Sequence, residues 1–130
     1  MHPFRKAVER RDVDAINALL ADDVVFTSPV AFKPYAGKPI TSAIIAAVIE
    51  VFEDFRYIRE YGEKGVRGDA LMFEAKVDGK ALTGCDFIRT NSEGLISDFM
   101  VMVRPLSAAQ ALSEQMAARF DDIVRRASNA

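Results

Sequence analysis

The sequence contains one cysteine, one histidine and no tryptophan among its 130 residues. Because the single cysteine, Cys85, cannot form an internal disulfide, we expect a protein of the reducing cytoplasm. A metal cage built from thiolates and imidazoles needs several such ligands, so we predict no metal site. No apolar run approaches the roughly 18 residues of a membrane-spanning helix. No apolar segment typical of a secretory signal follows the first basic residues, so we expect neither a membrane protein nor a signal peptide.

The chain also lacks an excess of charge of one sign. Its 17 Lys and Arg residues and 19 Asp and Glu residues give a net charge of −2. This charge is too small to favour nucleic acid or an anionic membrane as a partner. Half of the residues are hydrophobic and 28% are charged, as in ordinary globular proteins. We therefore assign residues 1–130 to a single domain with its own hydrophobic core.

Helical periodicity dominates the first part of the chain. Apolar residues recur at helical spacing over residues 3–20. Asp12 lies in their midst and is typical of an N-cap, so we predict two helices that meet there. Asp22 and Asp23 interrupt the pattern and are interpreted as a helix stop and turn. A β-branched and aromatic strand then follows over residues 24–27.

After a proline-rich loop, a third helix of about 14 residues begins at Pro39, where the missing N–H would be unpaired in any case. Beyond this helix the periodicity changes from helical to alternating, which indicates strands. Asp78-Gly79 is a strong signal for a two-residue hairpin turn. Ser107 and Gln110 have the spacing of a capping box at the start of a final helix. The predicted strands cover residues 55–66, 71–77, 81–90 and 95–103, and the final helix covers about 107–126.

Strands joined by hairpins, with helices on one side of them, predict an α+β domain. The last strand is apolar on both faces, with Phe99, Val101 and Val103 on one face and Met100 and Met102 on the other. A strand of this kind needs cover on both sides. We therefore expect a homodimer that covers the second face, unless the final helix covers it instead.

Three stretches carry a resemblance to a known superfamily: LLADDVVFTSP from Leu19, YAGKPI from Tyr35 and DFIRTN from Asp86. They resemble the SnoaL-like and ketosteroid isomerase-like members of the nuclear transport factor 2-like superfamily. The resemblance covers residues 4–103 and implies a curved antiparallel sheet wrapped around the N-terminal helices, like a cone around an apolar hollow. The final helix resembles an extension of some bacterial members, which leaves a core of about residues 4–104. Motifs this short specify a fold better than a reaction.

Steroid isomerases of this superfamily use three groups. One carboxylate moves a proton, while a tyrosine hydroxyl and a protonated carboxyl stabilise the enolate oxygen. By the resemblance, Ser28 replaces the first carboxylate, and Phe4, eight residues before Asp12, replaces the tyrosine. Asp86 keeps the third position. A serine without an adjacent base has no useful basicity at neutral pH, so we do not predict steroid-type isomerisation.

Asp86 is the candidate catalytic residue. It lies among apolar neighbours, where desolvation would raise its pKa and let it donate a proton or a hydrogen bond to a ligand oxygen. The alternative is a structural carboxylate that pairs with an arginine or faces solvent on the other side of the sheet. Tyr35, with Tyr57 and Tyr61, could offer a hydroxyl to the ligand, although the YAGK stretch around Tyr35 is also typical of a packing feature of the fold. The candidate ligand-binding residues around the hollow are Phe4, Phe26, Ser28, Tyr35, Phe99, Val101 and Val103.

Two functions remain open from the sequence. The first is a small enzyme, or former enzyme, that acts on a lipophilic oxygenated molecule by isomerisation, cyclisation, hydration or elimination without a cofactor. The second is a non-catalytic ligand-binding or protein-interaction domain, which the loss of two polar site positions favours. A cavity of about 300 Å³ or more with Asp86 at its base would favour the first function. A hollow plugged by Phe4, Phe26 and Phe99 would favour the second.

Overall fold

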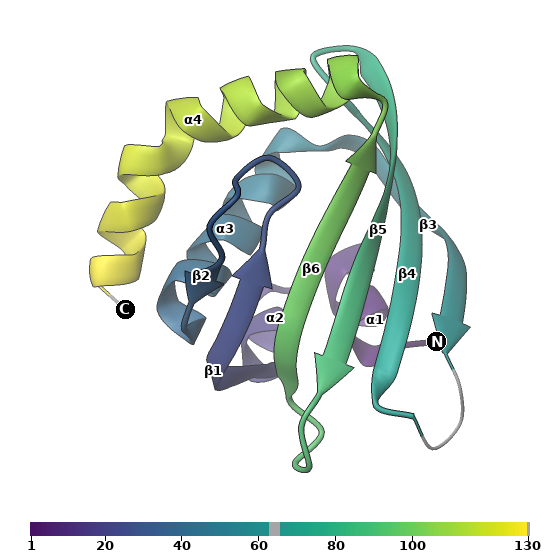
Figure 1. The fold of residues 1–130 in the computed structure, drawn as a ribbon, viewed down its shortest axis with the longest axis vertical. Coiled ribbons are helices and arrows are strands. Elements are labelled where there is room, and N and C mark those ends of the chain that lie inside the picture. Colours follow the sequence, from purple (N-terminus) through teal and green to yellow (C-terminus); the bar gives the residue numbers. More distant parts are fainter. Residues whose placement is uncertain (63–65, 130) are drawn as a thin grey trace.

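The computed structural model describes residues 1–62 and 66–129, which form an α+β domain (Figure 1). Helices lie on one side of a curved sheet, and a long C-terminal helix crosses the end of that sheet. The helices are α1 (Pro3–Glu9), α2 (Val13–Ala18), α3 (Lys38–Val51) and α4 (Leu106–Ser128). The strands are β1 (Leu20–Thr27), β2 (Tyr35–Ala36), β3 (Glu53–Gly62), β4 (Gly68–Val77), β5 (Lys80–Thr90) and β6 (Ile96–Arg104).

The strands form one sheet in the order β2-β1-β6-β5-β4-β3. Neighbouring strands are antiparallel except for β1 and β6, which run parallel. The sheet curves around α1, α2 and α3, and α4 leaves the end of β6 to pack against α3 (Figure 1). This arrangement confirms the predicted fold, a curved antiparallel sheet wrapped around N-terminal helices with a C-terminal helix added, and only the parallel β1–β6 pair departs from it.

Local sequence signals explain several of the element ends. The Asp12 carboxylate accepts a hydrogen bond from the Ala15 N–H at 3.1 Å and caps α2, which confirms that two helices meet there. Pro39 lies in the first turn of α3, as predicted. Asp78 and Gly79 connect β4 to β5 with φ angles of 50° and 75°, the left-handed geometry that a two-residue hairpin requires.

Two local predictions are wrong. Asp22 and Asp23 do not end a helix, because both lie exposed inside β1. The pairing of β1 with β6 is irregular at this point, which allows neighbouring side chains to face solvent together. Ser107 does not cap α4, because the helix already begins at Leu106 and has no side-chain cap.

Several element ends also differ from the predicted ones, among them the starts of β1 and β4, which lie at Leu20 and Gly68. The strand predicted over residues 55–66 corresponds to β3, which already begins at Glu53 and ends at Gly62. Residues 63–65 of that prediction lie outside the described residues. Helix α4 extends to Ser128, slightly beyond the predicted end. Apart from the short strand β2, which lies in the predicted loop, the order of the elements is as predicted.

The outer face of the sheet, away from the helices, carries apolar side chains of β5 and β6. Met102 is 55% exposed and Phe87 is 42% exposed. Cys85 and Met100, their partners in the strand register, are half-buried. Helix α4 therefore leaves this face open, and the homodimer stays a prediction. No helix in the described part of the chain is long and apolar enough to cross a membrane.

Candidate functional site

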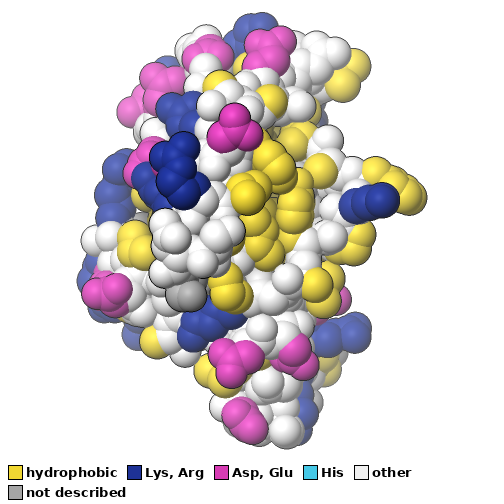
Figure 2. All heavy atoms as spheres, turned by 90° about the vertical axis from the view of Figure 1, so that its left-hand side faces the viewer, with side chains coloured by type: hydrophobic (Ala, Val, Ile, Leu, Met, Phe, Trp, Pro, Cys, Tyr) yellow, Lys and Arg dark blue, Asp and Glu magenta, His cyan; other side chains and the backbone are white. Residues whose placement is uncertain are grey.

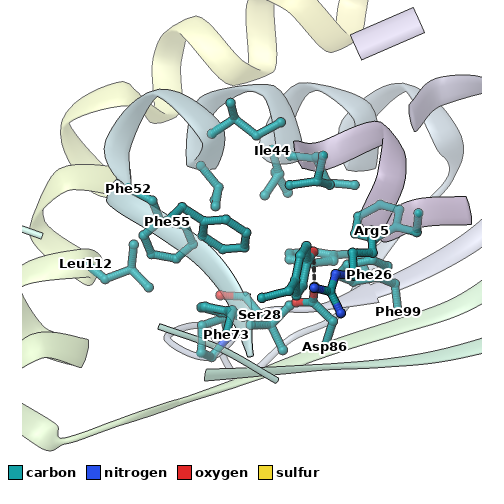
Figure 3. A pocket seen from close by; sticks show the side chains of 18 of the residues that line it. Arg5, Phe26, Ser28, Ile44, Phe52, Phe55, Phe73, Asp86, Phe99 and Leu112 are labelled. Carbon is teal, nitrogen blue, oxygen red and sulfur yellow. Dashed lines mark hydrogen bonds between the residues drawn. The ribbon is translucent and has the colours of Figure 1, made fainter. Parts of the chain in front are cut away.

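A cavity of about 360 Å³ lies between the concave face of the sheet and helices α1, α3 and α4 (Figure 3). Phenylalanine rings form two clusters in its wall, and side chains of α3 such as Ile44 face it from the helical side. Neighbouring rings within each cluster have centroids 4.9 to 5.7 Å apart, so they pack on one another and leave the space between the clusters open. The clusters are Phe52 with Phe55 and Phe73, and Phe4 with Phe26 and Phe99.

Asp86 and Tyr57 form a buried hydrogen-bonded pair in the wall of this cavity. The Tyr57 hydroxyl donates to Asp86 Oδ2 at 2.8 Å, and the two residues are 7% and 5% exposed. Asp86 lies on the inner face of β5, where Leu82, Gly84 and Ile88 are buried beside it. The regular alternation of this strand therefore turns Asp86 inward, as the sequence predicts. Its side chain faces the apolar hollow rather than solvent.

Tyr57 reaches Asp86 from β3 across the intervening strand β4. Tyr57 is the register partner of Phe73 on β4, and Phe73 is the partner of Gly84 on β5. A Cβ atom at Gly84 would lie only 2.3 Å from Phe73 Cζ, so glycine leaves the space that the Phe73 ring occupies. The Phe73 and Tyr57 rings then meet edge to face, with centroids 6.2 Å apart. Gly84 and Phe73 thus hold the phenol near the carboxyl.

The surroundings of the pair control its protonation. Burial raises the pKa of Asp86 from 3.8 to about 7, although the hydrogen bond from Tyr57 acts in the opposite direction. Burial, and next the negative charge of Asp86, raises the pKa of Tyr57 well above its usual 10. Near neutral pH the phenol is therefore protonated, and the carboxyl is divided between its neutral and ionised forms.

The neutral pair has one O–H group more than its own hydrogen bond requires. Tyr57 and a protonated Asp86 have two O–H groups, and their mutual hydrogen bond uses only one of them. The other O–H remains for a ligand oxygen in the cavity. When Asp86 ionises, the Tyr57 proton is the only one left, and the carboxylate already accepts it. The pair therefore donates when neutral and accepts when ionised.

Arg5 stands beside this pair without neutralising it. Its guanidinium carbon lies 5.9 Å from the centre of the Tyr57 ring, close enough for a cation–π contact. The Arg5 guanidinium also makes an ion pair with Glu9 through Nε and another with Glu60 through Nη1, at 3.2 Å for the latter. Among the described residues Asp86 makes no ion pair with an arginine, so the structure does not support that alternative.

The structure brings most of the predicted ligand-binding residues to this cavity. Two of them do not reach it among the described lining residues. Tyr35 lies on β2, where its ring packs 6.4 Å from that of Phe26, and it lines a second, neighbouring hollow. Val103 is half-buried against the hydrophobic core, away from both hollows. Those that line the cavity with Asp86 are Phe4, Phe26, Ser28, Phe99 and Val101.

Ser28 lies in the cavity wall, and its hydroxyl oxygen takes part in a local hydrogen bond. Ser28 Oγ accepts a hydrogen bond from the Val30 N–H at 3.1 Å, which closes a local turn. No His, Asp or Glu side chain is hydrogen-bonded to it in the described part of the chain. The hydroxyl therefore has no base to activate it.

The most important residue missing from the predicted site is Tyr57. Tyr57 lies two residues after Phe55 on a strand, so both side chains point to the same face of the sheet. This spacing is the feature of the sequence that could have identified Tyr57 as a site residue. Which of the three tyrosines reaches Asp86 depends on the register of β3, β4 and β5, and that register could not be read from the sequence. Arg5 was missed for the same reason.

Comparison with known proteins agrees with this geometry. The SnoaL-like domain family matches residues 2–99, which is most of the chain. The chain belongs to the SnoaL-like domain family. Helix α4 lies beyond the matched part. No curated protein sequence matches the chain significantly.

Solved structures support the assignment of this SnoaL-like chain. A steroid delta-isomerase from Pseudomonas aeruginosa is 43% identical, with a TM-score of 0.87 over 94% of this chain and 89% of that one. An uncharacterised protein with a cystatin-like fold from Silicibacter pomeroyi DSS-3 is 38% identical, with a TM-score of 0.85 over 90% and 82% of the two chains.

A more distant neighbour shares the fold alone. It is a protein from Mycobacterium tuberculosis in complex with estradiol-17beta-hemisuccinate, at 20% identity and a TM-score of 0.63, over 82% of this chain and 91% of that one. The SnoaL-like fold and the steroid isomerase-like neighbour together identify a member of a small-ligand-binding family.

Proposed function

We propose that this SnoaL-like protein binds a lipophilic small molecule that carries a carbonyl or similar oxygen, and that the Tyr57–Asp86 pair donates a hydrogen bond to this oxygen. One observation carries the proposal: a buried carboxyl with a pKa near 7 lies in the wall of an otherwise apolar cavity, hydrogen-bonded to a phenol. Burial of a polar group of this kind destabilises the fold unless the group is fully hydrogen-bonded, so such groups are often found at functional sites.

The cavity supports the class of ligand. A volume of about 360 Å³ is within the range of small-molecule sites. Its facing phenylalanine clusters favour a flat, largely apolar body, which would fit between the rings. The description of the 43% identical relative as a steroid delta-isomerase supports a ligand with fused rings and an oxygen.

The chemistry that we propose uses one acid–base group. The neutral pair would polarise a carbonyl, and ionised Asp86 would accept a proton from a carbon or oxygen nearby. Reactions of this kind are isomerisation, cyclisation, hydration and elimination, and they need no cofactor. Ser28 stands at the position where steroid isomerases of the superfamily carry their base, so the steroid reaction is not part of the proposal.

The binding proposal is tested with 6-acetyl-2-dimethylaminonaphthalene, whose fluorescence reports the polarity around its ketone and hydrogen bonds to it. We expect emission to rise when the probe enters the cavity. The double variant Asp86→Leu with Tyr57→Phe removes both O–H groups of the pair and should weaken binding about tenfold, the effect of one hydrogen bond of roughly 1.4 kcal/mol. Asp86→Asn keeps an N–H donor and should bind nearly as well as the wild type.

The dependence on pH separates this hydrogen bond from simple hydrophobic binding. Affinity of the wild type should fall as pH rises through about 7, because the pair loses its free O–H, whereas Asp86→Asn should show no such change. Equal affinity of the wild type and the double variant Asp86→Leu with Tyr57→Phe for the probe at pH 6 would overturn the proposal.

The second candidate is a non-catalytic binding protein, which Ser28 and Phe4 at the two altered positions favour. A 5-ene-3-ketosteroid, followed by ultraviolet absorbance as its double bond moves into conjugation, tests this point. We expect almost no turnover by the wild type and a gain of about 100-fold or more with Ser28→Asp, which adds the missing base. Rapid turnover by the wild type would contradict the interpretation of Ser28.

We also propose a homodimer that covers the outer sheet face. The exposed Met102 and Phe87 would become buried in it, as apolar interface cores usually are. Met102→Lys should then yield a monomer in size-exclusion chromatography with light scattering. Val13→Lys, at a 40% exposed position on α2, is the control and should stay dimeric. A monomeric wild type at micromolar concentration would refute the dimer.

A cytoplasmic location is proposed as well. Burial, and next the charge of Asp86, raises the pKa of the Cys85 thiol, so this lone cysteine stays protonated and unreactive. A cysteine that forms no disulfide is typical of proteins in a reducing compartment. Fractionation of the source cells, with detection by antibody, tests the location, and recovery in the membrane or secreted fraction would contradict it.

A further inference from the structure

A second hollow of about 440 Å³ lies next to the cavity that holds the acid pair. It is more open and is bounded by β1, the loop that follows β1, β2, α3 and residues 113–123 of α4. The two hollows have part of their walls in common, so they adjoin rather than lie apart. The shared wall residues are Phe26, Ser28, Val30, Ile44 and Met116.

The second hollow is lined mainly by apolar side chains. The Tyr35 and Phe120 rings lie 6.4 Å apart at its wall, and Tyr35 lies at the same distance from Phe26, which also borders the first cavity. The small side chains of Ser113 and Ala117 face it from α4 and leave it open. Figure 2 shows hydrophobic side chains gathered in the middle of the molecular face that carries α3, β2 and the end of α4.

Met116 lies at the boundary of the two hollows. It is half-buried on α4 and lines both of them. Methionine has an unbranched, flexible side chain that adapts to different neighbours. Its side chain can therefore move aside for a thin apolar chain without displacing the helix.

We propose that the ligand is an elongated lipophile whose oxygen meets the Tyr57–Asp86 pair and whose apolar tail passes Met116 into the hollow beneath α4. This inference rests on the proposed function and adds the shape of the ligand and a second binding compartment. Helix α4, which lies outside the part that matches the SnoaL-like family, supplies one wall of this tail compartment.

The test uses three 6-acetyl-2-naphthylamine probes that differ only in one N-alkyl group, methyl, propyl or hexyl. The acetyl group marks the Asp86 end, and the alkyl chain extends from the opposite end of the ring system. For the wild type we expect affinity to rise about threefold to fourfold with each methylene that becomes buried. Ala117→Phe should fill the second hollow and remove this gain while leaving affinity for the methyl probe unchanged.

Ala118→Phe is the matched control, because it makes the same substitution at the next, also exposed, helix position, which lines neither hollow. It should keep the full gain with chain length. An affinity that does not increase from methyl to hexyl, or an equal loss in both phenylalanine variants, would overturn the tail compartment. If instead binding of the methyl probe does not depend on the Tyr57–Asp86 pair, the proposed function itself fails.

Discussion

Replacing Asp86 by asparagine should remove one strong pH dependence from the stability of the protein. Burial raises the pKa of Asp86 from its ordinary value of 3.8 to about 7 in the folded protein. Between these values the folded state binds a proton that the unfolded state has already lost. The free energy of unfolding therefore falls as pH rises. This stabilisation is fully present below about pH 3.8 and is fully lost above about pH 7.

The magnitude follows from the two pKa values. The folded and unfolded states differ in the number of protons that Asp86 binds. Summed from pH 5 to pH 8, this difference lowers the free energy of unfolding by about 2.5 kcal/mol. This is a large part of the total stability of a small domain, which is about 5–15 kcal/mol. Asparagine has nearly the same shape and still accepts the Tyr57 hydrogen bond, but it does not titrate.

Urea unfolding followed by far-ultraviolet circular dichroism measures the effect. The difference in unfolding free energy between Asp86→Asn and the wild type should grow by about 2.5 kcal/mol in favour of the variant from pH 5 to pH 8. Titrations of other groups cancel in this difference. Asp98→Asn, at an exposed position of β6, should leave the wild-type pH dependence intact. A difference between Asp86→Asn and the wild type that stays constant over this range would refute the reasoning.

Two further predictions concern the residues that hold the pair. Tyr57→Phe removes the hydrogen bond that lowers the pKa of Asp86, so this pKa should rise further, and a fall in a carbon-13 NMR titration of the carboxyl would contradict our account. Gly84→Ala places a Cβ against the Phe73 ring and should cost about 1–3 kcal/mol in urea unfolding. Gly68→Ala, where a Cβ meets nothing closer than 3.9 Å, is the control and should be near neutral.

The fold could be predicted because its signals are local. Asp12 as a helix cap and Asp78-Gly79 as a hairpin turn act within a few residues of themselves. The alternation along β5 likewise identifies the face on which Asp86 lies, since each strand residue points opposite to its neighbours. These features need no knowledge of distant contacts.

The site could be predicted only in part, because its central contact is not local. Tyr57 and Asp86 are 29 positions apart in the chain and meet across β4 through a register that only the folded sheet fixes. Asp22 and Asp23 were misread for a similar reason, since their exposure inside β1 depends on its irregular pairing with β6. Long-range pairing therefore accounts for the missed contact and for this error, whereas the correct predictions depended on local signals.

The acid pair also limits the reactions that the cavity can support. A single carboxyl with a pKa near 7 is able to give or take one proton, but it cannot do both in the same step. Tyr57 supplies a hydroxyl to the pair, whereas no acidic or imidazole side chain is hydrogen-bonded to Ser28 in the described part of the chain. A reaction in this site must therefore move one proton through Asp86 from one ligand atom to another, or obtain its second acid–base group from the ligand. A ligand that offers neither would be bound and left unchanged.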